Sequence, residues 1–292
     1  MEQAALSFTT IELSQKDRID SIRRSYGHTL SSHAFSSLYL WKDKMKLKVC
    51  LSDQLFCVKC EQKDTDEYFF PCGAEEEKQS VISKLLDQDQ LTFRYLRNED
   101  IEFLQKYFPG RFYFESIRED WEYIYDKEEQ VRLKGNSFKH LRSKVHRGEQ
   151  SHQWTITTLS KNTIPLATEI TERWQAETKH NGESVDMDAT LKALEFFEEL
   201  QLSGILMMDG EKPLAFALGT AITEDTFDLH ISKTLEEDID CYLKWELFRQ
   251  LPKHIRYINR EEDLGIEGLR LHKTEMKPVR FNELWKGWTI TE

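Results

Sequence analysis

One order of predicted helices and strands occurs twice along the 292 residues of this chain. Each half shows two helical segments, three strand-like segments, a helix and then a further strand. The predicted helices lie at residues 15–26, 33–41, 76–88, 99–108, 164–180, 188–202 and 238–250. The predicted strands lie at residues 46–52, 54–61, 67–73, 91–96, 111–116, 121–126, 204–210, 213–222, 226–233 and 255–259. The order of the predicted elements repeats, whereas the amino-acid sequence itself does not.

This order predicts an α+β fold made of two tandem domains. Three successive strands with short turns indicate an antiparallel meander, and Asp209-Gly210 is a strong hairpin signal between two of them. The order matches the GNAT acyltransferase fold, so we expect two tandem GNAT-like domains. The polar stretch from His146 to Gln153 sets the expected boundary, with one domain over residues 1–147 and the other over residues 148–292.

Composition narrows the class of protein. The formal net charge is −12, so the molecule as a whole should repel nucleic acid and anionic lipid. Salt screens charges beyond about 8 Å, however, so a local basic patch can act independently of the total. The chain lacks an apolar run of about 18 residues and a secretory signal, so we expect no integral membrane segment. Five cysteines, an odd number, fit a reducing compartment, and we expect a cytoplasmic location.

Two features that resemble chemical motifs receive a structural interpretation. Cys57 and Cys60 form a CxxC pair, but they lie in an alternating strand, where residues three apart point to opposite faces. A second pair is absent from the sequence, so we expect no metal site. His230 lies on the strand at residues 226–233, and core packing is favoured there over an orientation toward a cleft.

The segment from Arg132 to Arg147 contains six lysine or arginine residues and no acidic residue. Phosphate groups are the natural partners of such a cluster. The candidate substrate-binding residues within it are Lys139, Arg142, Lys144 and Arg147. The cluster lies at the expected boundary between the two halves, and ligand sites favour such interfaces. The alternative is a solvated charged helix that packs through Phe138, Leu141 and Val145.

A charged loop follows the strand at residues 255–259, in the stretch from Tyr257 to Lys273. Gly265 and Gly268 permit sharp turns and close approach of a ligand, and we include both among the substrate-binding candidates. The candidate catalytic residues of this loop are Asn259, Glu262, Asp263, Arg270 and Lys273. A structural network of ion pairs is the alternative, because positive and negative residues alternate along the loop.

The segment that would bind the pyrophosphate of acyl-CoA has the wrong composition. In the GNAT fold, a glycine-rich basic loop before a helix places backbone N–H groups around that group. The corresponding stretch here, residues 231–246, has no glycine and five acidic residues, and an acidic start of a helix repels phosphate. Either the donor is not an acyl-CoA, or it binds in another way.

The loop resembles the signature of the phosphatidylglycerol lysyltransferase C-terminal domain family. That signature is an Asn-Arg-Glu-x-Asp-Leu-Gly-x-x-Gly-Leu-Arg run followed by a lysine and a proline. The matching residues are Asn259, Arg260, Glu261, Asp263, Leu264, Gly265, Gly268, Leu269, Arg270, Lys273 and Pro278. Gly135, Lys139 and Arg142 are similar to a second, basic block of the family, which often has Asn where this chain has Ser143.

The resemblance implies a tandem GNAT fold related to Fem-type transferases, which use aminoacyl-tRNA as donor and a lipid or a peptidoglycan precursor as acceptor. We therefore expect no bound cofactor, with aminoacyl-tRNA as co-substrate, tRNA as partner, and peripheral contact with lipid left open. Arg270 and Lys273 would stabilise negative charge or bind phosphate. Glu262 or Asp263 would bind the α-ammonium group or accept a proton, and Asn259 would hydrogen-bond the acyl group. An acyl-CoA-dependent N-acyltransferase and a non-catalytic anion-binding module are the alternatives.

Overall fold

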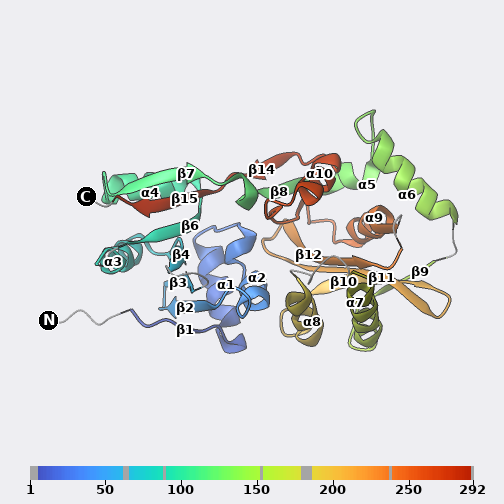
Figure 1. Ribbon diagram of the computed structural model, residues 1–292, viewed down its shortest axis with the longest axis horizontal. Coiled ribbons are helices and arrows are strands. Elements are labelled where there is room, and N and C mark those ends of the chain that lie inside the picture. Colours follow the sequence, from blue (N-terminus) through green and yellow to red (C-terminus); the bar gives the residue numbers. More distant parts are fainter. Residues whose placement is uncertain are drawn as a thin grey trace. The chain divides into compact units, whose positions relative to one another are not determined.

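The fold is known from a computed structural model that describes residues 6–61, 66–87, 90–151, 154–178, 186–236 and 239–290. Helices and strands are mixed throughout, which confirms the predicted α+β class (Figure 1). The chain divides into two compact units. The first comprises residues 1–122, 262–265 and 282–292, and the second comprises residues 123–261 and 266–281.

The first unit is built around one sheet with the strand order β1-β2-β3-β4-β6-β15-β7, in which β5 also pairs with β3. Its helices are α1 (Lys16–Ser25), α2 (Phe35–Trp41), α3 (Glu75–Leu85) and α4 (Asn98–Tyr107), with 3-10 helices at Leu13–Gln15, Ser31–His33 and Arg118–Asp120. Its strands are β1 (Thr9–Thr10), β2 (Leu47–Leu51), β3 (Leu55–Cys60), β4 (Glu67–Phe69), β5 (Cys72–Gly73), β6 (Thr92–Leu96), β7 (Phe112–Ser116) and β15 (Trp285–Thr289).

The second unit repeats the plan around a sheet with the strand order β14-β8-β13-β12-β11-β10-β9. Its helices are α5 (Lys127–Arg132), α6 (Lys139–Ser151), α7 (Ile164–Thr178), α8 (Met187–Glu195), α9 (Asp240–Gln250) and α10 (Glu267–Glu275). Its strands are β8 (Glu122–Asp126), β9 (Thr155–Thr158), β10 (Ser203–Asp209), β11 (Lys212–Ala221), β12 (Thr226–Thr234), β13 (Tyr257–Asn259) and β14 (Arg280–Asn282). The predicted hairpin joins β10 and β11, where Asp209 pairs with Lys212.

The division differs from the expected boundary between residues 147 and 148, which falls inside α6 of the second unit. Strand β8 was expected to complete the first half, but it pairs with β13 in the second sheet. Strand β15, from the end of the chain, pairs with β7 and β6 in the first sheet, and the red ribbon of β15 runs beside β7 in Figure 1. The chain therefore enters the second unit early and returns to the first at its end.

Each unit has an apolar core of its own. In the first unit, residues such as Phe70, Phe93 and Leu104 form a buried cluster. In the second unit, Phe227 and Leu229 of β12 pack in the cluster that includes α9. Burial of a side chain of this size contributes about 1.5–3 kcal/mol, so the packing fixes the position of β12, which carries the candidate site.

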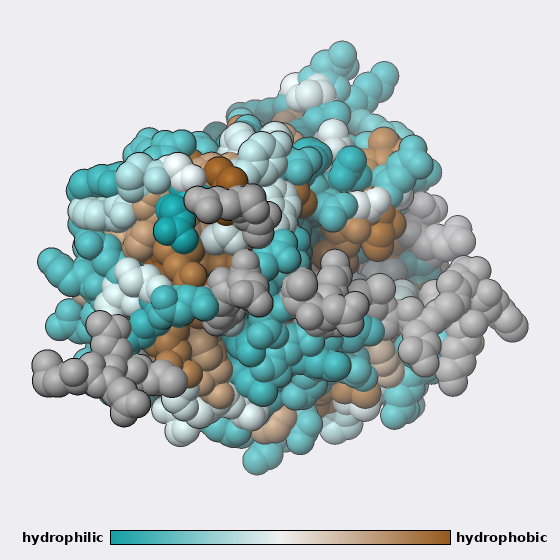
Figure 2. Space-filling model, turned by 60° about the vertical axis from the view of Figure 1, so that its left-hand side comes forward, coloured by the Kyte–Doolittle hydropathy of each residue, from teal (hydrophilic) through white to brown (hydrophobic). Residues whose placement is uncertain are grey.

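The exterior is rich in charged and polar side chains. They cover most of the face drawn in Figure 2, and apolar residues reach the surface there in smaller areas. Within the described residues, the helices all fall short of the length and apolar character that a bilayer crossing requires.

Candidate functional site

The candidate site of the second unit lies where two parallel strands stop pairing. β12 and β13 pair from Thr226 and Tyr257 to Asp228 and Asn259. β12 then continues to Thr234 alongside β11, whereas β13 ends at Asn259. In an open sheet, ligands bind beyond the carboxyl ends of parallel strands, and this is such a position.

An irregularity in β12 adjoins this position. Along β11, Leu218 and Gly219 are consecutive, but their partners on β12 are Ile231 and Leu229, so His230 is the additional residue of a β-bulge. Gly219 is required opposite the bulge, because a Cβ atom there would lie 1.9 Å from the carbonyl oxygen of Asp228. Bulges redirect side chains and occur often beside active sites.

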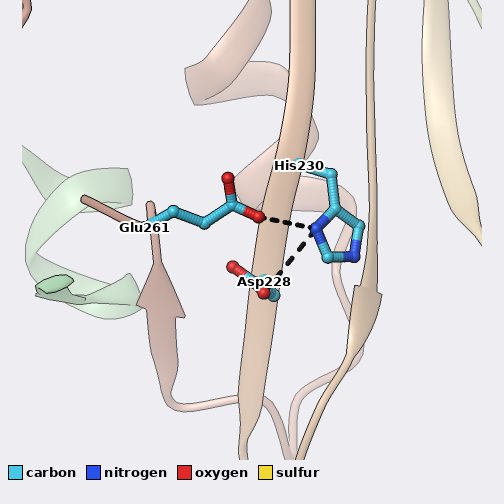
Figure 3. A group of neighbouring side chains, drawn as sticks. All are labelled: Asp228, His230 and Glu261. Carbon is cyan, nitrogen blue, oxygen red and sulfur yellow. Dashed lines mark hydrogen bonds and ion pairs between the residues drawn. The ribbon is translucent and has the colours of Figure 1, made fainter. Parts of the chain in front are cut away.

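His230 lies against two carboxylates (Figure 3). Its Nδ1 is 2.9 Å from Oε1 of Glu261 and 3.6 Å from Oδ2 of Asp228. The side chains of Asp228 and His230 are 0% and 2% exposed, whereas that of Glu261 is 18% exposed. Glu261 is therefore the member of the group that a ligand can reach.

Burial lowers the pKa of His230 below its ordinary value, and the Asp228 carboxylate offsets part of that effect. The imidazole is therefore neutral at pH 7. Because a carboxylate oxygen can only accept a hydrogen bond, the nitrogen beside it, Nδ1, carries the proton of the neutral ring and donates to Oε1 of Glu261. Among the described residues, no hydrogen-bond partner reaches Nε2, which is buried.

The backbone of Glu261 is held in place by two predicted site residues. Glu261 has a left-handed φ of 56°, an uncommon conformation for a residue other than glycine. Its N–H donates to Oδ1 of Asn259 at 2.8 Å. The Lys273 ammonium donates to the carbonyl oxygens of Arg260 and Glu261. Asn259 and Lys273 are both buried, and these bonds favour a positioning role for them rather than contact with a phosphate.

Other predicted residues of the loop lie in the first unit. Asp263 is fully buried, forms an ion pair with Arg118 at 3.2 Å and accepts a hydrogen bond from the N–H of Gly265. Glu262 is half-buried. The ion pair of Asp263 favours the alternative interpretation of the loop as a structural network of ion pairs, because the carboxylate contacts an arginine of the same unit.

Arg270 and Gly268 lie on α10 of the second unit. Gly268 is exposed and has open space around it, whereas Arg270 is half-buried. The Arg270 carbonyl oxygen accepts a hydrogen bond from the Thr274 hydroxyl group. These contacts fix the backbone of the helix and leave the catalytic role of Arg270 a prediction.

The predicted basic cluster lies on α6 and borders an open groove of about 600 Å³. Lys139 and Arg142 line this groove, whereas Lys144 and Arg147 do not. The remaining lining residues are Val131, Arg132, Leu133, Ser143, Val145, His146, Glu149 and Trp245. The groove therefore combines an apolar floor with a basic rim. The guanidinium group of Arg142 also donates to the carbonyl oxygens of Leu133 and Gly135.

Arg142, Arg270 and Lys273 are basic residues for which the sequence predicted binding of phosphate or stabilisation of negative charge. The groove on α6 contains Arg142, but its lining includes neither Arg270 nor Lys273. The ammonium group of Lys273 is directed into the fold at the backbone of residues 260–261. The groove and the group around His230 are therefore two separate features of the second unit.

A second charged network begins at the first turn of α9. Asp240 contacts Lys244, accepts from the Ser232 hydroxyl group at 3.1 Å and lies 3.3 Å from Nε2 of His272. Burial acts to raise the pKa of Asp240, but Lys244 and His272 hold that pKa well below its ordinary value. A charged carboxylate therefore occupies the start of this helix.

Sequence reasoning missed the residues that carry most of this geometry. Asp228, Glu261, Asp240 and Lys244 were not site candidates, and His230 was assigned to the core. A bulge at His230 has no sequence signal of its own, although the alternation of Phe227, Asp228 and Leu229 placed Asp228 on the face opposite the core. The CxxC residues, Cys57 and Cys60, are buried in β3, where their thiols donate to the carbonyl oxygens of Phe69 and Met45.

The model of the family described as phosphatidylglycerol lysyltransferase, C-terminal, matches residues 23–285 of this chain. No curated protein matches the sequence. A conserved protein of unknown function from Bacteroides thetaiotaomicron is similar in structure, with 24% identity, a TM-score of 0.89, and coverage of 98% of this chain and 99% of that one.

Two further solved structures have the same fold at lower identity. L-PGS from Bacillus licheniformis is 14% identical, with a TM-score of 0.67 and coverage of 93% of this chain and 91% of that one. FemX is 8% identical, with a TM-score of 0.62 and coverage of 98% of both chains. The fold is therefore the tandem GNAT arrangement that the order of elements predicted, and it is shared with Fem-type proteins, as the family resemblance implied.

Proposed function

The chain belongs to the phosphatidylglycerol lysyltransferase C-terminal family, and we propose that it transfers an aminoacyl group from aminoacyl-tRNA to an amine or hydroxyl acceptor. The acceptor is a lipid, a peptide or a small molecule, and the reaction takes place in the cytoplasm. The observation that carries the proposal is the contact between Glu261 and His230, where β12 and β13 stop pairing.

In this reaction the acceptor nitrogen or oxygen attacks the ester carbonyl carbon of the donor. A new amide or ester bond forms, and the bond to the ribose oxygen of the tRNA breaks. Glu261 takes the proton of the acceptor and returns it to the departing ribose oxygen, as a general base and then a general acid. The ester is already activated, so correct placement of the two substrates supplies much of the rate.

His230 acts behind Glu261 as a positioning residue. It is buried and neutral, and its Nδ1–H donates to the carboxylate and fixes the direction in which that group points. At the bulge, the backbone of His230 is the extra residue that falls outside the regular pairing of β11 with β12. A backbone N–H released in this way is the kind of donor that stabilises the oxyanion of an acyl-transfer intermediate.

The choice of donor rests on two charged features. The basic rim of the groove, with the exposed Lys139 and Arg142, suits the phosphates of a tRNA strand. The start of α9, where a GNAT enzyme would hold the pyrophosphate of acyl-CoA, carries the charged Asp240 instead. That carboxylate repels a pyrophosphate, so aminoacyl-tRNA is favoured over acyl-CoA.

The experiment measures the transfer of a labelled amino acid from charged tRNA to an acceptor in the presence of the purified protein. The family description names a lysyl donor and phosphatidylglycerol, so lysyl-tRNA and phosphatidylglycerol vesicles are the first substrate pair, and other charged tRNAs and soluble amines follow. We expect label to move from tRNA to acceptor. Binding of charged tRNA without transfer to any acceptor would support the anion-binding module, and thermal stabilisation by acyl-CoA with acyl transfer would support the N-acyltransferase.

A further inference from the structure

Asp228, His230 and Glu261 have the donor types and the spacing of a metal site (Figure 3). One ligand atom from each residue lies within 4.8 Å of the other two. Around an ion with bonds of about 2.1 Å, neighbouring ligand atoms lie about 3–3.5 Å apart. The separations of 2.9 Å and 3.6 Å from Nδ1 are close to that range. We propose that these three side chains bind one divalent transition-metal ion.

Charge balance at a buried position supports the assignment. The two carboxylates of this group carry two negative charges, and Asp228 lies at 0% exposure. Removal of charge from water is costly unless an opposite charge compensates it. A divalent cation within reach of all three side chains would neutralise the group completely, whereas one proton on the ring would neutralise half of it.

The set of donor atoms indicates which ions fit. Imidazole nitrogen suits zinc, iron, nickel and copper, whereas carboxylate oxygen alone suits magnesium, calcium and manganese. One nitrogen with two carboxylates therefore combines both kinds of ligand and favours a first-row transition-metal ion over magnesium and calcium. Three protein ligands leave coordination positions open, and water would enter from the side of Glu261, the member at 18% exposure.

An ion bound to Nδ1 would require the other tautomer of His230. The proton that Nδ1 shares with Glu261 would have to move to Nε2, and the ring would stay neutral. The ion and the hydrogen bond between His230 and Glu261 therefore exclude each other. This inference does not depend on the proposed transfer reaction, because it concerns binding alone.

Mn²⁺ is the probe, because the five cysteines of the chain offer Zn²⁺ other ligands. The full chain, stripped with chelator, is titrated with Mn²⁺, and the free ion is followed by its paramagnetic resonance signal. We expect one bound Mn²⁺ per chain. D228N and E261Q should each weaken binding by about tenfold or more, since even residues behind the ligands change metal affinity by that factor.

H146Q is the matched control, because His146 and Glu149 form an exposed pair at 3.3 Å that belongs to no group of three ligands among the described residues. It should bind Mn²⁺ as the parent chain does. The proposal is overturned if the parent chain binds no Mn²⁺ at millimolar concentration, or if E261Q binds as tightly as the parent. Circular dichroism checks the fold, and E261Q decides the question if the more buried D228N variant does not fold. Aminoacyl transfer by chelator-treated protein is measured separately, so failure of ion binding and failure of transfer are distinguishable.

Discussion

His230 and Glu261 each lie two residues beyond the last pair that joins β12 to β13, and their side chains meet at 2.9 Å. They are 31 residues apart in sequence. Because Asp228 pairs with Asn259 in the parallel ladder, His230 and Glu261 reach the same level along the two strands. The bulge at His230 lies at this contact. The contact between His230 and Glu261 is therefore a consequence of strand register, and changes to the residues that support it should act through Glu261.

Lys273 should behave as a structural residue. Its ammonium group is buried and donates to the carbonyl oxygens of Arg260 and Glu261. In K273M the apolar stem remains, but buried carbonyl oxygens lose their donor, so unfolding in urea should show a loss of about 1–3 kcal/mol. K161M, at an exposed lysine, should change stability by less than about 0.5 kcal/mol. Unchanged stability of K273M would restore Lys273 as a candidate for direct contact with substrate.

Asp240 should stabilise the second unit through Lys244. Lys244 is 4% exposed, and burial lowers its pKa despite the neighbouring carboxylate. D240N leaves a buried ammonium group without its counter-charge, and such a change costs about 3–5 kcal/mol. The double variant D240N/K244M removes both charges and should recover most of the loss in the same urea titration. A double variant as unstable as D240N would show that Lys244 is not the reason for the loss.

Stability should fall as the pH is lowered from 7. Burial lowers the pKa of His33 to about 3, although a hydrogen bond to the Phe70 carbonyl oxygen opposes the shift. Burial also lowers the pKa of His28 well below its ordinary value. Between about pH 6.5 and 3 the unfolded chain binds a proton at His33 that the folded chain does not, which removes up to about 1.4 kcal/mol of stability per pH unit. His28 acts in the same direction.

Urea titrations between pH 7 and pH 5 measure this slope above the range of the carboxylates. H33Q should show a smaller slope than the parent chain, whereas H254Q, at an exposed histidine, should match the parent. A stability that rises or stays constant over this range would mean that these imidazoles are not buried in their neutral form.

Lys139 should contribute to the binding of tRNA without a role in folding. It is exposed on the rim of the groove, whereas Arg142 also holds two backbone carbonyl groups. K139A should weaken tRNA binding and reduce the slope of log K against log salt by about 0.7–0.9, the value for one phosphate contact. K253A, at an exposed lysine outside the groove lining, is the control. Equal slopes for K139A and the parent chain would place the tRNA elsewhere.

The order of elements could be predicted because it depends on local signals. Apolar periodicity gave the helices α1 and α7, and Asp209-Gly210 gave the hairpin between β10 and β11. The partners of β8 and β15 could not be predicted in this way. The amino-acid pattern of each strand is compatible with either sheet. Contacts with residues far away in the sequence decide which sheet the strand joins.

The sequence indicated the loop that contains Glu261 but not Glu261 itself, the residue of the loop that contacts His230. The run from Asn259 to Lys273 contains Glu261, yet the neighbouring Glu262 and Asp263 were chosen. The left-handed φ of Glu261 directs its side chain toward β12, and a sequence does not display that angle. His230, the partner of Glu261, has a buried side chain and lies between two apolar residues of β12. Its position in the sequence is therefore typical of a core residue.

We propose that the Glu261 carboxylate exchanges the proton in aminoacyl transfer, and single-turnover transfer of labelled amino acid from charged tRNA measures this role. E261Q keeps the shape of the side chain and should slow transfer by about 10²–10⁴-fold, the usual contribution of a general base, while tRNA binding stays unchanged. E267Q, at an exposed glutamate on α10, should transfer as fast as the parent chain. Transfer by E261Q at the rate of the parent would show that the Glu261 carboxylate does not exchange the proton.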